Sequence, residues 1–483
     1  MTSRTADAKT VDQFIRLVLQ GELSAEQAEE LYALGPEATT LVLLAINARN
    51  AKLLKNAAPA DHLSKPSGQK APFEKPNKKS SNNKKPGAKV GHSGSRRPRP
   101  ENIDRHEDVR LEKCPDCGGR LNRCQRTRTR IIEDLLEDLR TLATEYTIHR
   151  DYCPACQKDV EPVVVEAMPN ATLGHNMVTL SSWFHYGLGV TLGQVKDILG
   201  YHLQTKISTG GLVHAYQRMA KVLTPWYEQI GQEARNSSHL HADETGWRVN
   251  GATWWLWCFC NDENCYYMID RSRGSPALQK FFTEAFDGVL ITDFWAAYWS
   301  VEVADRQFCL PHLLRDMVGV DQREESACWK SFSKRLRRLL GDGMRLSANR
   351  REFNTEDYQR RCRLLDQRLF KFAQGEYESL DAIRLGKRMM KHRDHIFTFL
   401  DYEDVTADNN FGERMIRPAV IIRKNSQSNR SELGAATQAI LMSVFRTLRL
   451  RGLDPIKTVV STLRTYVATG KLPPLPAPIP ANG

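Results

Sequence analysis

The chain has 483 residues and a formal net charge of +12, with 69 lysines and arginines against 57 acids. This length exceeds what a single hydrophobic core usually supports, so we expect about two to four domains. The sequence contains no apolar run of about 18 residues, and its first residues, MTSRTADAKT, contain no apolar signal segment, so a membrane span and secretion are excluded and a cytoplasmic location is expected. Eleven cysteines without such a signal favour thiols and metal ligands over disulfides. The positive charge indicates a polyanionic partner.

Residues 1–60 are predicted to form a helical N-terminal module. Apolar residues recur at helical spacing between residues 10 and 56, and Gly35 and Pro36 divide the helices. Because the spacing does not sustain a heptad pattern, a small helical bundle or dimerisation module is preferred to a helix-turn-helix.

Residues 61–105 are predicted to be a disordered basic arm. Between Lys65 and Pro100, eight lysines and three arginines stand against a single acid, Glu74, and Pro, Gly, Ser and Asn occupy many of the other positions. A solvated linker is the alternative, but a linker needs no such charge, whereas a basic arm gains affinity for DNA phosphates by counterion release. The arm residues predicted to contact DNA are Lys78, Lys79, Lys84, Lys85, Arg96 and Arg97.

Residues 106–165 are predicted to form a small zinc-binding domain. The stretches CPDC and CPAC each suit two thiolates of a tetrahedral Zn²⁺ site, and together they would close one structural site. The segment between them includes the strand-like stretches RTRTRIIEDL and TEYTIH, and Cys124 is a spare or substitute ligand. The alternative is two unrelated redox or core cysteine pairs. The predicted zinc ligands are Cys114, Cys117, Cys153 and Cys156.

Residues 166–236 are predicted to be helical, with a Ser-Thr-Gly-Gly break at residues 208–211. The stretches TLGQVKDIL and TGGLVHAYQRMAKVL have the proportions of two helices joined by a turn. They suit either a DNA-contacting module or, as we prefer, a helical wall of the next domain.

Residues 237–470 are predicted to form the catalytic core of a multidomain α/β chain, a mixed sheet with helices of the ribonuclease H-like kind. Three β-rich runs, HLHADETGWRV, TWWLWCFC and CYYMIDR, are joined by an Asn250-Gly251 turn and an Asn-Asp-Glu-Asn turn. The helix-like SPALQKFFTEAF, the short buried strand GVLITD, the stretch AAYW and the strand RQFCL follow. In a ribonuclease H-like sheet the first and fourth strands are neighbours, so we expect Asp243 and Asp293 to meet at one edge of the sheet.

A third acid is expected from a helix that follows a helical insertion at about residues 318–400. Asp408 and Asn409 suit the N-cap of a helix that carries Asn410, Glu413 and Arg417 on one face. The alternative for Glu413 is an ordinary i,i+4 ion pair with Arg417.

The same three acids, Asp243, Asp293 and Glu413, can also be read as ordinary strand-end and helix-surface acids. Their occurrence together in ribonuclease H order favours a site instead. Carboxylates are the hard oxygen ligands that a two-metal phosphoryl-transfer site needs.

At these residues the chain resembles the DDE transposases of the insertion sequence 66 family. The resemblance extends over the basic arm ending in GAKVGHSGSRRPRP, the zinc-binding segment with CPDCGGRL and YCPAC, the core stretches DETGWRV and ITDFWAAY, and a cysteine-to-histidine step at Cys309 and His312. Its most specific part is the block DNNFGERMIRPAVIIRKNS followed by GAATQAILMSVFRTLRLRGLDP. The resemblance implies a bacterial transposase that acts with Mg²⁺ through acids matching Asp243, Asp293 and Glu413.

The implied reaction is strand cleavage at the ends of an insertion sequence, followed by attack of the freed 3′-hydroxyl on target DNA. We predict that Asp243 bridges two Mg²⁺ ions while Asp293 and Glu413 each help to hold one. Further phosphate contacts are predicted on the helix of the third acid, with solvent-exposed helix charges as the alternative. They are Arg417, Arg423 and Lys424.

The predicted partner is double-stranded DNA, bound by a homo-oligomer that works near the nucleoid, with small accessory proteins of the same element as further partners. A Pro-rich tail at residues 471–483 completes the expected organisation. Two other functions remain open at this stage: a nuclease or resolvase of the same fold, and a catalytically idle DNA-binding regulator derived from a transposase.

Overall fold

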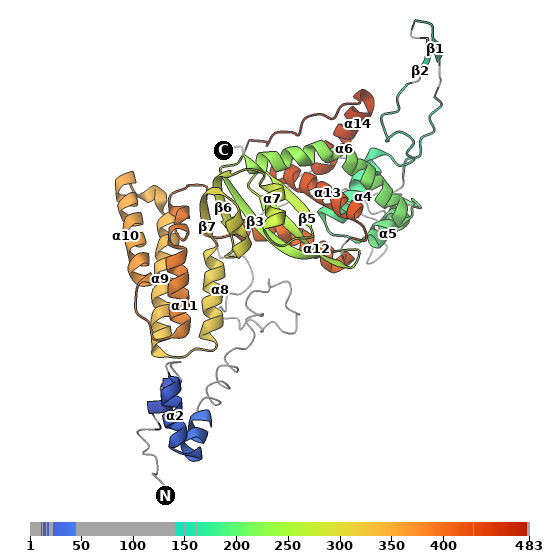
Figure 1. Cartoon of the computed structure of the whole chain (residues 1–483). Coiled ribbons are helices and arrows are strands. Elements are labelled where there is room, and N and C mark those ends of the chain that lie inside the picture. Colours follow the sequence, from blue (N-terminus) through green and yellow to red (C-terminus); the bar gives the residue numbers. More distant parts are fainter. Residues whose placement is uncertain are drawn as a thin grey trace, which may run out of the picture. The chain divides into compact units, whose positions relative to one another are not determined.

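The computed structural model describes residues 11–44, 141–148 and 151–480, apart from residues 12, 16, 19–22, 156, 161 and 428 (Figure 1). The chain divides into two compact units, and the larger one contains residues 1–70, 148–196 and 207–483. None of the helices in the described ranges combines the length and the apolar character needed to span a bilayer.

The N-terminal residues form short helices, as predicted. Helix α2 (Ala25–Ala33) begins with a capping box, in which the Ser24 hydroxyl accepts a hydrogen bond from the Gln27 amide and the Gln27 side chain accepts one from the Ser24 amide. The helix ends before Gly35, whose φ of +98° favours glycine, and residues 36–44 are helical again. The predicted Gly-Pro break is therefore confirmed. These helices bury a small apolar cluster of Val11, Phe14, Leu31, Ala38 and Val42.

The predicted arm and most of the predicted zinc ligands lie outside the described residues. Strands β1 (Asp151–Cys153) and β2 (Lys158–Val160) form an antiparallel pair, so Cys153 lies at the end of a strand beside a turn. The prediction of a strand in TEYTIH is wrong for the part that is described, because residues 141–148 form neither helix nor strand. Their side chains are all exposed, so the alternating pattern has no buried face to occupy.

The core of the larger unit is a five-stranded mixed sheet with the strand order β5-β4-β3-β6-β7. The first three strands are antiparallel and joined by hairpins, whereas β6 runs parallel to β3 and β7 runs parallel to β6. The predicted mixed sheet and the predicted adjacency of its first and fourth strands are confirmed. The strands are β3 (His239–Val249), β4 (Ala252–Cys260), β5 (Cys265–Asp270), β6 (Phe286–Thr292) and β7 (Val303–Phe308).

The hairpin turns form where the sequence predicted them. Asn250 and Gly251 both have positive φ, at 49° and 75°, which is the geometry of a two-residue turn that matches the strand twist. At the next turn the Asn261 side-chain oxygen accepts hydrogen bonds from the amides of Glu263 and Asn264 at 3.1 and 2.8 Å. These turns fix the register of β3, β4 and β5.

One face of the sheet is covered by α7 (Ser275–Phe281) and by a short 3-10 helix at Ala296–Ser300. Leu240 and Ala242 of β3 point to this face, where they join Leu278, Phe281 and Tyr298 in an apolar cluster. Helix α7 is shorter than predicted, because β6 already begins at Phe286. His241 and Asp243 alternate with these residues along β3 and therefore point to the opposite face.

Two long helices pack on β5. Helix α6 (Thr209–Arg235) begins after Ser208, at the predicted break, and the Tyr227 hydroxyl donates a hydrogen bond to the Tyr267 carbonyl at 2.9 Å. Helix α13 (Glu432–Leu450) lies beside α6 (Figure 1), and the Ser443 hydroxyl accepts a hydrogen bond from the Tyr267 amide at 2.8 Å. The region before the sheet thus contributes a helical wall. Further α-helices among the described residues are α4 (His175–Ser182), α5 (Leu192–Leu203) and α14 (Pro455–Thr469).

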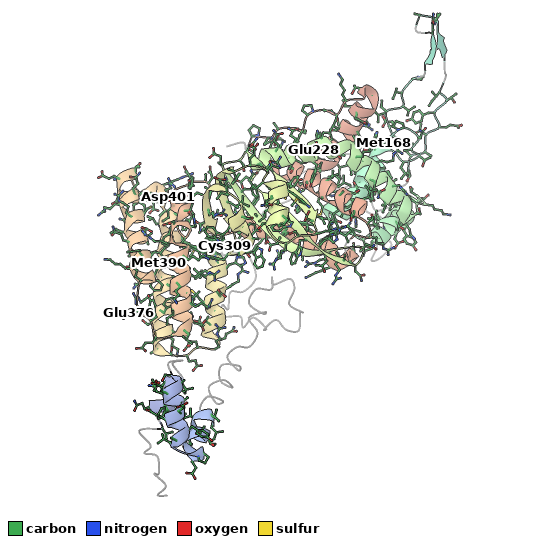
Figure 2. The ribbon with its side chains drawn as sticks, viewed as in Figure 1. Met168, Glu228, Cys309, Glu376, Met390 and Asp401 are labelled. Carbon is green, nitrogen blue, oxygen red and sulfur yellow. The ribbon has the colours of Figure 1, made fainter. Side chains whose placement is uncertain are left out.

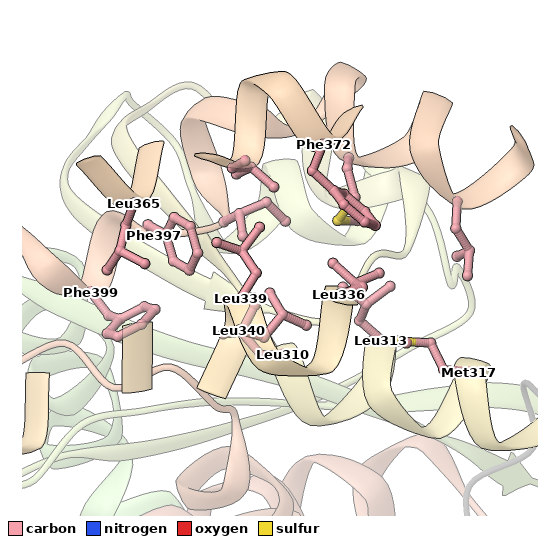
Figure 3. Packing of buried hydrophobic residues seen from close by; sticks show 14 of the residues in the cluster. Leu310, Leu313, Met317, Leu336, Leu339, Leu340, Leu365, Phe372, Phe397 and Phe399 are labelled. Carbon is pink, nitrogen blue, oxygen red and sulfur yellow. The ribbon is translucent and has the colours of Figure 1, made fainter. Parts of the chain in front are cut away.

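Four helices follow β7 and lie side by side (Figure 1). They share an apolar core, shown in Figure 3, in which Leu313 of α8 packs with Leu336 and Phe372 of the later helices. Val289 and Ile291 of β6 belong to the same core, so these helices are anchored to the sheet. The helices are α8 (Leu310–Asp321), α9 (Ala327–Ala348), α10 (Thr355–Ala373) and α11 (Leu380–Lys391). Helices α9 to α11 lie within the bounds predicted for an insertion.

Candidate active site

The first two predicted acids lie on β3 and directly after its parallel neighbour β6. The register of β3 and β6 pairs His239 with Val289 and His241 with Ile291. Two residues beyond the last pair, the same offset leads from Asp243 to Asp293, which directly follows β6. The charge of Asp293 raises the pKa of Asp243, so the two carboxylates lie near each other at this end of the strands.

The third predicted acid comes from α12 (Asn410–Ser426), where Glu413 lies in the first turn. The helix begins where the sequence predicted, and the Asp408 carboxylate accepts a hydrogen bond from the Asn410 amide at 2.9 Å. Asn409, the N-cap residue, is 1% exposed. Its side-chain amide nitrogen donates to the Ala242 carbonyl at 2.9 Å, and its side-chain oxygen lies 2.9 Å from Nδ1 of His241. These two bonds hold the start of α12 against β3, next to Asp243.

The electrostatics of Asp243 reflect this arrangement. Burial raises the pKa of the Asp243 carboxyl well above its usual value, and the nearby carboxylates of Glu244, Asp293 and Glu413 raise it further. The other two predicted acids therefore lie close enough to Asp243 to act on its carboxyl. Burial also lowers the pKa of His241 to about 4, so its imidazole is neutral and can donate from Nδ1 to Asn409. The result is a half-buried group of carboxylates, which is the chemistry that divalent cations neutralise.

Glu244 is a further acid of the site that the sequence interpretation missed. It points to the opposite face from Asp243 and is buried, and its carboxylate accepts a hydrogen bond from the Tyr298 hydroxyl at 2.7 Å and two from Arg273 at 3.1 Å. Burial and Asp293 raise its pKa to about 7, outweighing the opposite effects of Tyr298 and Arg273. An acid at a core-facing position of a central strand was the signal that could have identified it.

The Glu244 network also supports the turn that carries Asp293. The Arg273 guanidinium stacks on the ring of Trp295, 4.1 Å from its centroid. The Trp295 amide in turn donates a hydrogen bond to the Asp293 carboxylate at 2.8 Å. The chain of contacts from Glu244 through Arg273 thus ends at one of the predicted acids.

A second group surrounds Glu413 from α8. Arg315 lies 2.8 Å from a carboxylate oxygen of Glu413, and Nε2 of His312 lies 3.7 Å from the same oxygen. Cys309, labelled in Figure 2, caps the N-terminus of α8 and is fully buried. Burial raises the pKa of its thiol to about 12 and lowers the pKa of His312, which Arg315 lowers further. Cys309 and His312, which the family resemblance includes, therefore both lie next to Glu413.

The predicted phosphate contacts on α12 separate into two groups. Arg417 and Lys424 are exposed. Arg423 is half-buried, and its guanidinium donates hydrogen bonds to the Thr245 hydroxyl at 2.7 Å and to the Gly246 carbonyl. Since Arg423 joins α12 to β3, we leave it out of the proposed DNA contacts.

Comparison with known proteins gives the family of this chain. The sequence profile of the Transposase IS66 family matches residues 171–437, which is more than half of the chain and includes all three predicted acids. The chain belongs to the IS66 transposase family. Among similar proteins, the uncharacterized protein y4jD of Sinorhizobium fredii is 24% identical over 417 residues, which cover 76% of this chain and 78% of the relative. The uncharacterized protein y4qI of the same organism is 24% identical over 285 residues, half of each chain.

Proposed function

We propose that this member of the IS66 transposase family cleaves DNA strands at the ends of an insertion sequence and joins them to target DNA. Asp243, Asp293 and Glu413 are the proposed catalytic residues. One observation supports the proposal: Asp293, directly after β6, and Glu413, in the first turn of α12, both lie close enough to Asp243 of β3 to raise the pKa of its carboxyl.

The donor set fits divalent magnesium. Carboxylate oxygens are hard ligands, and the charges of Asp293 and Glu413 disfavour the ionised form of Asp243, an effect that a bound cation would relieve. Asp243 is the acid on which both of the others act, so we assign it the bridging position, and Asp293 and Glu413 would each hold one ion. When bound, two Mg²⁺ ions would supply the positive charge that stabilises the attacking and leaving oxygens of a phosphodiester exchange.

The residues around the acids keep the site in place. Asn409 fixes the start of α12 and therefore the position of Glu413, whereas the Trp295 amide fixes the Asp293 carboxylate. Cleavage and joining are both in-line displacements at phosphorus, so one set of fixed carboxylates can serve for both steps.

The proposed partner is double-stranded DNA, at the element ends and at the target. Arg417 and Lys424 extend from the helix that carries Glu413 and are exposed, which suits phosphate contacts near the acids. The basic arm would add sequence-independent affinity, and the four cysteines would hold one structural Zn²⁺. Assembly as a homo-oligomer on DNA, with accessory proteins, belongs to the same proposal.

The test separates DNA binding from chemistry. Asp243→Asn, Asp293→Asn and Glu413→Gln keep the side-chain shape and remove the charge, so each should abolish Mg²⁺-dependent cleavage and joining while DNA affinity stays near the wild-type value. Asp287→Asn is the matched control, because Asp287 is an exposed acid on β6.

The outcomes distinguish the competing functions. Cleavage without joining would identify a nuclease or resolvase, and DNA binding without either reaction in the wild-type chain would identify a regulator. Cleavage by Glu413→Gln at the wild-type rate would place the third ligand elsewhere, with Glu403 and Asp408 the substitutes to test next.

A further inference from the structure

Two helix N-termini meet beside the proposed magnesium site and bring together three side chains of different chemistry. The Sγ of Cys309, a ring nitrogen of His312 and a carboxylate oxygen of Glu413 all lie within 4.8 Å of one another. Cys309 and His312 come from the start of α8 and Glu413 from the start of α12. The proposed magnesium chemistry uses only Glu413 of these three.

Backbone hydrogen bonds fix the relative positions of these groups. The Cys309 amide donates to the Thr292 carbonyl at 2.8 Å, and the Leu310 amide donates to the Ala407 carbonyl at 2.9 Å. The Asn409 amide donates to Cys309 Sγ at 3.2 Å. The cluster is therefore held at the junction of α8, β6 and α12 before any ligand arrives.

The donor set differs from that of a magnesium site. A thiolate, an imidazole and a carboxylate are the groups that Zn²⁺ and related ions take, whereas Mg²⁺ takes oxygen ligands. The Cys309 thiol would release its proton to solvent as the ion binds. The 3.7 Å separation of His312 Nε2 and Glu413 Oε1 is already close to the spacing of about 3.5 Å between ligands of a tetrahedral zinc ion. Three protein donors leave a fourth position open.

Two further observations fit a cation at this place. Nδ1 of His312 is buried and has no hydrogen-bond partner in the described parts of the chain, so no protein group holds this nitrogen there. The His312 and Glu413 side chains are 33% and 37% exposed, so two of the three donors are accessible from solvent.

We propose that Cys309, His312 and Glu413 form a second cation site that takes a thiophilic divalent ion of the Zn²⁺ class, and that an ion held there withdraws Glu413 from the magnesium ions. The first half of this inference concerns binding alone, and the second half rests on the proposed function. Because one carboxylate serves both sites, zinc binding and magnesium binding compete. Zinc then acts as an inhibitor of strand cleavage.

The binding half is tested with Co²⁺, whose bond to a thiolate gives a charge-transfer absorption. The full-length chain is first loaded with one equivalent of Zn²⁺ to fill the proposed four-cysteine site, freed of excess metal and titrated with Co²⁺. The wild-type chain should bind one Co²⁺ with this absorption, and Cys309→Ser should lack it. His312→Gln, at a half-exposed position, should weaken binding by on the order of tenfold or more. Cys328→Ser, which changes a half-buried cysteine of α9, is the matched control and should behave as wild type.

The binding half is overturned if the wild-type chain shows no such absorption, or if Cys309→Ser and His312→Gln both keep it at wild-type strength. For the regulatory half, Mg²⁺ should weaken Co²⁺ binding. Zn²⁺ should inhibit cleavage by the wild-type chain at concentrations about tenfold or more below those needed for Cys309→Ser, each referred to its own zinc-free rate. Equal zinc sensitivity overturns this half. A chain that shows the Cys309-dependent absorption but never cleaves DNA would contradict the proposed function and leave the cation site standing.

Discussion

Asn409 offers a sharp test of how the third acid is positioned. Its side chain makes two buried hydrogen bonds across to β3, to His241 and to the Ala242 carbonyl. Asn409→Ala removes both and leaves two buried groups without partners. Each such group costs about 1 to 3 kcal/mol, so the attachment of α12 to β3 should weaken by about 2 to 6 kcal/mol.

Amide hydrogen exchange along α12 measures this effect directly, because it reports local opening even in a chain that does not unfold in one step. A loss of about 2 kcal/mol corresponds to about 30-fold faster exchange. Cleavage activity should fall as well, since Glu413 lies one turn after Asn409, whereas DNA affinity should not change. Asn410→Ala is the matched control, because Asn410 is exposed, and its effect should stay within about 0.5 kcal/mol. Equal exchange rates in the two variants would refute the view that Asn409 holds α12 to the sheet.

Three further predictions concern other parts of the chain. Purified protein should contain one Zn²⁺ per chain, and Cys114→Ser should release it whereas Cys328→Ser should not; zinc content unaffected by Cys114→Ser would exclude the four-cysteine site. Replacing the eight arm lysines with glutamine should weaken DNA binding for all sequences and flatten its salt dependence, by a slope of about 0.9 for each phosphate that the arm no longer neutralises; an unchanged slope would reduce the arm to a spacer. In metal-free protein the pKa of the Glu244 carboxyl is raised to about 7 from its ordinary 4.5. The protonated carboxyl therefore stabilises the fold fully below pH 4.5, and this stabilisation is lost as the pH rises through about 7. Glu244→Gln should therefore reduce the fall in stability between about pH 5 and pH 8 by about 3 kcal/mol, and parallel pH profiles would contradict this.

The sequence was sufficient to predict the features that depend on local pattern. The alternation in HLHADETGWRV predicted a strand, and the Asn250-Gly251 pair predicted the turn with two positive φ angles. The predicted strand order then led to the expectation that Asp243 and Asp293 are neighbours. Paired residues of β3 and β6 differ by a constant number of positions, and the same difference separates these two acids. Helix-capping residues likewise predicted the start of α12.

Features that depend on packing between distant segments could not be predicted in this way. The strand pattern gives Glu244 a core-facing position, but its partner Tyr298 comes from a 3-10 helix 54 residues further along the chain. Arg423 has the sequence context of a phosphate contact, yet tertiary packing directs it to Thr245 on β3. The contact of His312 with Glu413 joins residues 101 positions apart in the chain, and no local periodicity encodes such a meeting.

The central claim is that Asp243, Asp293 and Glu413 form one two-metal site, and crystals soaked in Mn²⁺ test it most directly by anomalous scattering. Manganese takes the same oxygen ligands as magnesium and scatters strongly enough to be located. We predict two manganese peaks among the three carboxylates, about 3.5 to 4 Å apart and with Asp243 between them, and the loss of both in Asp243→Asn. Manganese bound away from these carboxylates, or an unchanged pair of peaks in Asp243→Asn, would contradict the account.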